Sequence, residues 1–350
     1  MKLKEFDYHL PESLIAQEPL AKRDTSRLLI LSKESGEITD RVFTDLTHEL
    51  WKNDVLVINK TRVLKARLKW KVTLRVRKTE REVEVFLHKQ ISENVWDCMV
   101  YPWKRFWENN IISFYNENNI LIMTGEVQSM THIWRIIKFS PINKNFFDTV
   151  ETIGKIPLPP YIKKDIADSE RYQTVYNNEI WSVAAPTAWL HFTDELFIKL
   201  KEKGVKIEKV LLHVWLGTFW HVRETEEIEK HQMHSEYIEL EDIVANRLNA
   251  YKSEWKRIIA VWTTSVRVLE SFSDDDGILH SGQKETGIFI YPWYKWKFIS
   301  SMITNFHLPE STLLMLVSSL AWQKNIKKAY SHAIGQEYRF FSFWDAMWIN

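Results

Sequence analysis

Asp54-Val55-Leu56-Val57-Ile58-Asn59 is the stretch that decides the fold. An apolar, mostly β-branched run between polar ends is typical of a buried strand. The preceding residues 43–50 suit a helix that Thr44 or Asp45 caps. The segment therefore predicts a helix followed by a buried strand.

Strands and helices alternate again in the second half of the chain. Thr193 is a suitable cap for a helix over 194–203, which Gly204 would end. Further strands and helices are predicted at 210–214 (strand), 243–255 (helix), 258–261 (strand), 266–272 (helix) and 312–322 (helix). This alternation indicates an α/β layer architecture.

A segment of different character separates these two parts. Residues 67–72 and 83–88 alternate or are rich in β-formers, and asparagine-rich breaks occur at 109–110 and 116–119. Ile156-Pro157-Leu158-Pro159-Pro160-Tyr161 then marks a boundary. We therefore expect an α/β main domain made of residues 1–65 and 153–350, with an inserted all-β barrel domain at 66–152.

Composition sets further limits. At 350 residues the chain exceeds a typical single domain. Its net charge of +1 does not indicate a polyanionic partner for the molecule as a whole. The single cysteine, Cys98, rules out an internal disulfide. The start of the chain is charged, and the longest weakly polar stretch, 311–322, is too short to span a bilayer. We expect a cytoplasmic protein with no membrane segment.

The stretch S-V-A-A-P-T-A-W-L-H-F-T at 182–193 is the strongest candidate for a substrate site. Its small residues allow a ligand to approach the backbone closely, while hydroxyl and imidazole groups follow in order. The candidate residues are Ser182, Ala185, Pro186, Thr187, His191 and Thr193.

Three later segments place hydroxyl, amide or imidazole groups where predicted strands end. In open α/β sheets, ligands bind outside the carboxyl ends of the strands. The alternative interpretation for Thr263 and Thr264 is simple helix capping. The candidates are His213, Gly217, Thr218, Thr263, Thr264, Arg267, Asn305 and His307.

Two charged patterns remain ambiguous. The run from Lys60 to Arg81 holds ten lysines and arginines, among them Arg62, Lys65, Arg67, Lys69 and Lys71. Such a run is either a solvated strand face or a surface that binds phosphates. His231 and His234 share a face if helical, so zinc is conceivable with a third ligand, although a structural or substrate-facing pair is favoured.

Taken together, these segments resemble the S-adenosylmethionine:tRNA ribosyltransferase-isomerases of queuosine biosynthesis. The matching stretches include R-D-T-S-R-L-L, V-L-V-I-N-K-T-R-V, S-V-A-A-P-T-A-W-L-H-F-T, H-Q-M-H-S-E-Y, T-N-F-H-L-P-E-S-T-L-L-M-L-V and Y-R-F-F-S-F-W-D-A-M. They extend from Phe6 to Met347 and are weakest in the β-rich insertion.

The resemblance implies a transferase that uses S-adenosylmethionine as a substrate, with no metal and no further cofactor. The enzyme would move the ribosyl moiety of S-adenosylmethionine onto 7-aminomethyl-7-deazaguanine at the wobble position of a tRNA anticodon. It would also isomerise this sugar. The products are epoxyqueuosine-tRNA, adenine and methionine. Acid/base and hydrogen-bonding roles then fall to His191, His213, His234, Thr193 and Arg267, and we expect a monomer. The basic residues 62, 65, 67, 69 and 71 become candidate tRNA contacts.

Tryptophan is the discordant residue. The chain holds 17 tryptophans and only 9 glycines, whereas about 7% usage predicts roughly 25 glycines. Tyr101-Pro102-Trp103 and Tyr291-Pro292-Trp293 repeat a context that normally has Pro-Gly at the centre of a type II turn. The resembling family usually has glycine where this chain has tryptophan at 70, 103, 107, 181, 189, 215, 255, 262, 293, 322 and 344.

Two hypotheses account for this departure. A UGA codon read as glycine in the source has been translated as tryptophan, or the chain is an impaired homologue that binds tRNA without turnover. A metal-dependent hydrolase built on His231 and His234 is a third, weaker alternative.

Overall fold

The computed structural model describes residues 1–17, 20, 22–73, 80–131, 134–157, 179–182, 191–213, 228–231, 233, 235–340 and 345–350. The chain divides into two compact units. One holds the described residues of 1–62, Glu179 and the described residues from 191 onward, and the other holds the described residues of 63–157 with 180–182. An α/β part and a β part are both present, as predicted, while the domain limits stay predictions.

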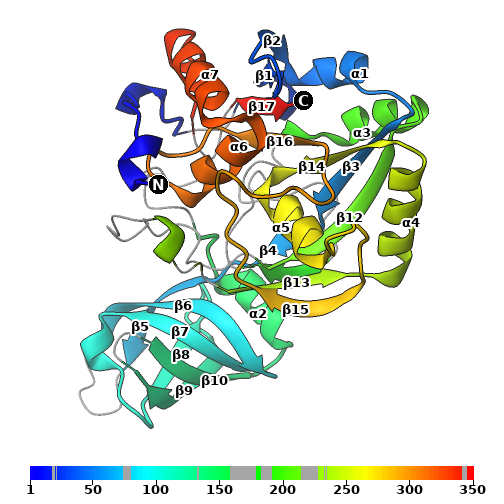
Figure 1. Ribbon diagram of the computed structural model, residues 1–350. Helices are drawn as coiled ribbons and strands as arrows, with labels where there is room; N and C mark the ends of the chain where they lie inside the picture. Colours follow the sequence, from blue (N-terminus) through cyan, green and yellow to red (C-terminus); the bar gives the residue numbers. More distant parts are fainter. Residues whose placement is uncertain are drawn as a thin grey trace. The chain divides into compact units, whose positions relative to one another are not determined.

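A nine-stranded sheet forms the first unit (Figure 1). Its order is β15 (Gly282–Thr286), β13 (Glu236–Leu240), β12 (Lys206–Leu212), β3 (Asp54–Asn59), β14 (Arg257–Val261), β16 (Ser301–Asn305), β17 (Ala346–Ile349), β1 (Arg27–Leu31) and β2 (Ile38–Val42). The four strands from β12 to β16 are parallel to one another. The predicted strand at 54–59 is confirmed, and all six of its residues are buried.

Helices pack around this sheet. They are α1 (Leu46–Glu49), α3 (Asp194–Glu202), α4 (Asp242–Ser253), α5 (Trp262–Phe272), α6 (Thr312–Ala321) and α7 (Gln323–Gly335). Short 3-10 turns occur at Leu3–Phe6, Glu12–Leu14, Arg23–Thr25, Phe43–Asp45 and Ile228–Lys230. Thr193 caps α3 by accepting from the Leu196 amide, as predicted. Within the described part of the chain, no helix has both the length and the apolar character needed to cross a bilayer.

A buried apolar core surrounds β3 at the centre of the sheet. Leu56 and Ile58 pack with Ile259, Val261 and neighbouring side chains of α1 and α3 in one buried cluster. Helix α5 contacts all four parallel strands, β12, β3, β14 and β16. Strand β3 therefore has neighbours on both edges and a packed helical layer.

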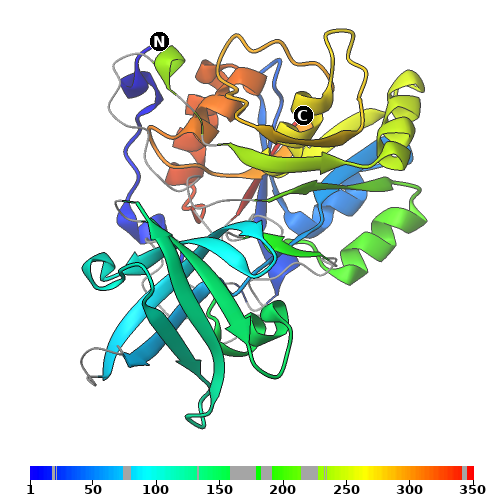
Figure 2. The same ribbon diagram turned by 90° about the horizontal axis from the view of Figure 1, so that it is seen from below.

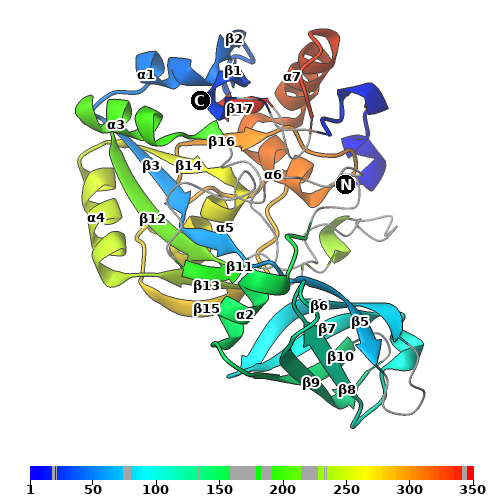
Figure 3. The same cartoon turned by 180° about the vertical axis from the view of Figure 1, so that it is seen from behind.

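The second unit is a curled six-stranded antiparallel sheet (Figure 2). Its order, which Figure 3 shows from behind, is β5 (Arg67–Thr73), β6 (Glu80–Ser92), β7 (Val95–Tyr101), β10 (Trp134–Pro141), β9 (Leu121–Met130) and β8 (Ile111–Tyr115). Helix α2 (Phe146–Ile153) packs on it through Phe146, which stacks on Trp96 at 5.4 Å between ring centroids. A pair of short strands, β4 (Thr61–Val63) and β11 (Glu179–Ser182), makes a third sheet.

Four tryptophans adopt backbone conformations that favour glycine. The φ angles are 60° at Trp255, 77° at Trp262, 78° at Trp293 and 62° at Trp322. All four belong to the eleven positions singled out above, of which the structure describes the backbone of eight (70, 103, 107, 181, 255, 262, 293 and 322). A positive φ is uncommon for any residue with a Cβ and rarer still for a bulky one.

The ends of α3 and α4 provide a comparison within the chain. In α4 the Trp255 amide bonds the Lys252 carbonyl at 3.0 Å, and the next amide, of Lys256, bonds the Tyr251 carbonyl at 3.0 Å. This is the Schellman pattern, in which glycine is usual at the left-handed position. Helix α3 ends in the same pattern with Gly204 at that position, at φ 85°. Trp255 thus occupies the place that glycine takes in α3.

The two Pro-Trp segments differ from each other. The Tyr294 amide bonds the Tyr291 carbonyl at 3.0 Å, and this closes a turn with Trp293 at φ 78°. The type II turn predicted there is confirmed. The same prediction is wrong for the first segment, where Trp103 begins a 3-10 turn, Trp103–Arg105, with an ordinary φ.

Candidate functional site

One edge of the large sheet carries several of the predicted polar residues. The carboxyl ends of β12, β3, β14 and β16 lie at this edge because the four strands are parallel. Strand β17 runs antiparallel to β16, and β1 runs parallel to β17, so the amino ends of β17 and β1 meet the same edge. We call it the polar edge, and it carries His213, Asn59, Thr264, Asn305, Asp345 and Ser26.

The turn from β14 to α5 lies at the centre of the polar edge. Helix α5 begins at Trp262, directly after Val261, so the predicted start at 266 is four residues late. The interpretation of Thr263 or Thr264 as helix cap is wrong, because both lie inside the helix and Val261 is the N-cap. Thr264 Oγ1 and Ser265 Oγ are buried and, among the described residues, have no hydrogen-bond partner.

His191 lies beside this turn in a buried position. Its ring centroid is 5.9 Å from that of Trp262 and 5.1 Å from that of Phe43. Burial lowers the pKa of His191 to about 4, while the Asp345 carboxylate acts to raise it and the Arg339 guanidinium to lower it. His191 is therefore neutral at pH 7, which suits a hydrogen-bonding role better than a charged one.

Asp345 lies near His191 and links three segments of the chain: the start of β1, the residues around Arg339 and the start of β17. Its carboxylate accepts from the Arg27 amide at 2.8 Å, the Arg339 amide at 2.8 Å and the Arg339 side chain at 3.2 Å. Only 2% of Asp345 is exposed. This carboxylate fixes the amino end of β1 beside the amino end of β17.

Arg267 points into the fold rather than to solvent. Its guanidinium pairs with the buried Glu236 carboxylate and reaches the Thr286 carbonyl at 3.4 Å. Burial lowers the pKa of Arg267 to about 10, so it keeps its charge at pH 7. The pair links α5 to β13 and β15, and the predicted catalytic role of Arg267 stays a prediction.

The end of β12 is joined to the end of β3 through side chains. Asn59 Nδ2 donates to the Leu212 carbonyl at 3.0 Å, and Asn59 Oδ1 accepts from the Leu212 amide at 3.1 Å. Thr61 Oγ1 donates to the same carbonyl at 2.8 Å. His213 follows at once, with its ring stacked on Tyr237 at 5.2 Å between centroids.

Asn305 is the last residue of β16, and His307 follows two residues later. His307 Nε2 lies 3.0 Å from Thr304 Oγ1, and the His307 amide donates to the Tyr330 hydroxyl at 2.7 Å. Burial lowers the pKa of His307 to about 3, so its ring is neutral. Asn305 is 4% exposed, and its Oδ1 has no hydrogen-bond partner within the described residues.

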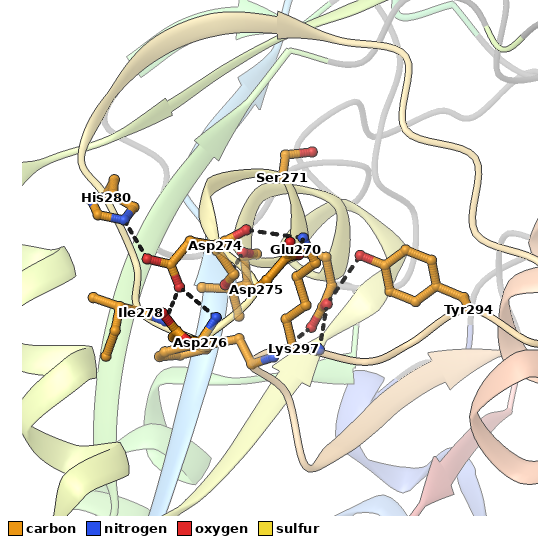
Figure 4. Close-up of polar contacts among 12 residues, drawn as sticks. Glu270, Ser271, Asp274, Asp275, Asp276, Ile278, His280, Tyr294 and Lys297 are labelled. Atoms are coloured by element: carbon orange, nitrogen blue, oxygen red, sulfur yellow. Dashed lines mark hydrogen bonds and ion pairs between the residues drawn. The ribbon is translucent and has the colours of Figure 1, made fainter.

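Glu270 anchors the far end of α5 (Figure 4). Its buried carboxylate accepts from the Lys297, Phe298 and Ile299 amides at 2.9, 3.1 and 3.1 Å, and from the Tyr294 hydroxyl at 3.2 Å. These bonds hold the loop that follows Trp293. The neighbouring residues 274–277 form the predicted surface turn, with the Gly277 amide bonding the Asp274 carbonyl at 3.1 Å.

Several predicted site residues are not placed by the structure. Ala185, Pro186, Thr187, Gly217, Thr218 and His234 lie outside the described residues, and Ser182 is described only as the last residue of β11. Thr193 is placed: besides capping α3, its hydroxyl donates to Asp24 at 3.3 Å.

In the sheet, acidic residues of the neighbouring strand lie opposite lysines of the basic run. Lys69 is opposite Glu84, and Lys71 is opposite Glu82. Lys65 Nζ lies 3.5 Å from Glu151 Oε2, and Arg67 Nε lies 3.1 Å from Glu84 Oε1. Of the histidine pair, only His231 is described, and its ring contacts Phe289 at 5.4 Å between centroids. No cluster of potential metal ligands occurs among the described residues.

Comparison with known proteins covers almost the whole chain. The family model described as "Queuosine biosynthesis protein" matches residues 3–349. The chain belongs to the queuosine biosynthesis protein family. A curated relative from Carboxydothermus hydrogenoformans, S-adenosylmethionine:tRNA ribosyltransferase-isomerase, is 49% identical over 349 residues, which cover 100% of both chains.

A solved structure supports the same family membership. The crystal structure of S-adenosylmethionine tRNA ribosyltransferase from Thermotoga maritima matches with a TM-score of 0.54 and 31% identity. The match covers 99% of this chain and 100% of that chain. The queuosine family assignment therefore rests on sequence and structure together.

Sequence reasoning overlooked part of the polar edge. Arg23, Asp24, Arg339 and Asp345 surround His191 and Thr193, yet none was predicted as a site residue. The available signal was their position inside two of the stretches that carry the family resemblance, R-D-T-S-R-L-L and Y-R-F-F-S-F-W-D-A-M.

Proposed function

We propose that the chain transfers and isomerises the ribosyl moiety of S-adenosylmethionine onto 7-aminomethyl-7-deazaguanine in a tRNA anticodon. The product is epoxyqueuosine-tRNA, and adenine and methionine leave. The observation that carries the proposal is the 49% identity to the ribosyltransferase-isomerase of C. hydrogenoformans across the whole of both chains. No metal or further cofactor enters this proposal.

The polar edge is the proposed S-adenosylmethionine side of the reaction. The reaction breaks the bond from ribose to adenine and the sulfonium carbon–sulfur bond, forms a new carbon–nitrogen bond to the aminomethyl group, and rearranges the sugar ring to an epoxycyclopentanediol, which takes up the remaining valence. These steps need hydrogen-bond donors and acceptors around a sugar. Neutral His191 lies 5.9 Å from Trp262 between ring centroids, and the Thr264 hydroxyl, two residues further along α5, has no hydrogen-bond partner among the described residues, so both could serve as such groups.

The β unit is proposed to contribute tRNA contacts as an inserted barrel domain. Lys65, Arg67, Lys69 and Lys71 of this unit, with Arg62 from the end of the first unit, would bind phosphates, although Lys65 and Arg67 already have carboxylate neighbours. Neutralising one of these residues is therefore expected to weaken tRNA binding only modestly. In this proposal the protein works as a cytoplasmic monomer.

Adenine release tests the proposal. Purified protein is incubated with S-adenosylmethionine and tRNA bearing the aminomethyl base, and free adenine is measured by chromatography. The assay is run on this chain and on a counterpart with glycine at the eleven discordant positions. If both preparations fold and neither releases adenine, the proposed activity is wrong.

A further inference from the structure

We propose that the space filled by the indole of Trp262 is the pocket for the adenine ring of the substrate, and that position 262 works as a glycine position. The inference rests on the function proposed above and deepens it by placing one part of the substrate.

Both the backbone and the side chain of Trp262 are ill-suited to the position. The residue adopts φ 77° where α5 begins. A side chain at such a φ strains the backbone, whereas glycine adopts it freely. The indole is 2% exposed, and its Nε1 has no acceptor among the described residues. Buried indole N–H groups usually find a partner.

Burial separates Trp262 from the other tryptophans with positive φ. Trp255, Trp293 and Trp322 are 94%, 82% and 63% exposed. These rings are largely exposed, and Trp293 and Trp322 contact each other at 6.2 Å between centroids, so glycine at those positions would vacate no enclosed space. At 262 the same exchange would vacate an enclosed space inside the α/β unit.

The surroundings of this indole are those of a ligand pocket. Leu56, Ile58 and Ile303 belong to the same buried apolar cluster as Trp262, and the His191 ring lies 5.9 Å away. Small-molecule sites are mostly apolar, with a few well-placed polar groups. Indole and adenine are both flat, fused six- and five-membered rings, so the vacated space has the shape of a purine.

Polar groups suited to the edge of a purine lie at the same turn. Thr264 Oγ1 and Ser265 Oγ, in the first turn of α5, are buried without a hydrogen-bond partner in the part of the chain that the structure describes. Asn305 Oδ1, at the end of the neighbouring strand β16, is in the same state. Leaving such groups unpaired is costly, and adenine offers the donors and acceptors to pair them.

Binding of free adenine tests the inference without tRNA or turnover. Equilibrium dialysis with labelled adenine compares this chain with the variants Trp262→Gly, Trp262→Ala and Trp262→Phe. Trp255→Gly is the matched control, because it makes the same exchange at a positive φ on the surface. Circular dichroism establishes that each preparation is folded.

Trp262→Gly is expected to bind adenine at least tenfold more tightly than this chain, and added indole should compete for the same space. Trp262→Ala should gain part of that affinity, whereas Trp262→Phe and Trp255→Gly should gain none. A folded Trp262→Gly or Trp262→Ala protein with no gain overturns the inference, as does an equal gain in Trp255→Gly or a failure of indole to compete. Adenine binding without adenine release from S-adenosylmethionine would instead count against the proposed function alone.

Discussion

Replacing Trp255 by glycine is expected to stabilise the protein, although it deletes the largest side chain. Trp255 is 94% exposed at the left-handed position of the Schellman turn that ends α4, with φ 60°. A left-handed conformation costs a residue with a Cβ about 1–2 kcal/mol. Glycine loses more backbone entropy on folding, and this cost offsets about 0.5–1 kcal/mol of the relieved strain. The net expected gain is about 0.5–1 kcal/mol.

Urea denaturation measures this gain. The midpoint should rise while the slope of the free energy of unfolding against urea concentration stays the same. The reciprocal variant, Gly204→Ala, should lose stability, since Gly204 has φ 85° and an added Cβ would meet Lys52 Cβ at 3.0 Å. Trp51→Gly is the control: that residue is 60% exposed but has an ordinary φ, so glycine should not stabilise there. The reasoning is refuted if Trp255→Gly is destabilised, or if Trp255→Ala gains as much as Trp255→Gly.

Three further predictions follow from buried groups and from the tryptophans. His191 and His307 have pKa values lowered from 6.5 to about 4 and about 3, so the unfolded chain binds protons first as pH falls; stability should drop by about 2 kcal/mol per histidine between pH 7 and 5. His307→Gln should remove its share of that drop in urea titrations, and an unchanged pH dependence would contradict the assignment. Arg267→Met should cost about 3–5 kcal/mol because it removes the guanidinium charge that pairs with the buried Glu236 carboxylate, and joint replacement with Glu236→Leu should recover most of it; equal losses in the single and double variants would show that the pair is not coupled. Peptide mass spectrometry of the protein from its source should find glycine at 255, 262, 293 and 322, and tryptophan there would refute the codon hypothesis.

Elements with a local chemical signal could be predicted from the sequence. Thr193 and Gly204 delimit α3 because a cap hydroxyl and a left-handed glycine act through their own backbone neighbours. Strand β3 was predictable from its apolar run. The start of α5 was not, because a helix that begins directly from a strand at Trp262 has no polar cap to mark it.

The site was predictable only in part for a topological reason. His213, Thr264 and Asn305 lie at or just after the carboxyl ends of parallel strands, where ligands of open α/β sheets bind, and a sequence pattern can use this rule. Asp345 joins them from the amino end of an antiparallel strand, β17, whose neighbours are far away in the sequence. No local pattern predicts such a pairing, so only the fold shows that Asp345 lies near His191, although the stretch that holds Asp345 carries the family resemblance.

The most direct test of the account is adenine release by the chain with glycine at the eleven discordant positions. With S-adenosylmethionine and tRNA bearing 7-aminomethyl-7-deazaguanine, we expect adenine and modified tRNA to form in equal amounts. Restoring tryptophan at 262 alone should abolish most of that release, because the indole refills the proposed pocket. A folded glycine chain that releases no adenine, with this tRNA present, would contradict the account.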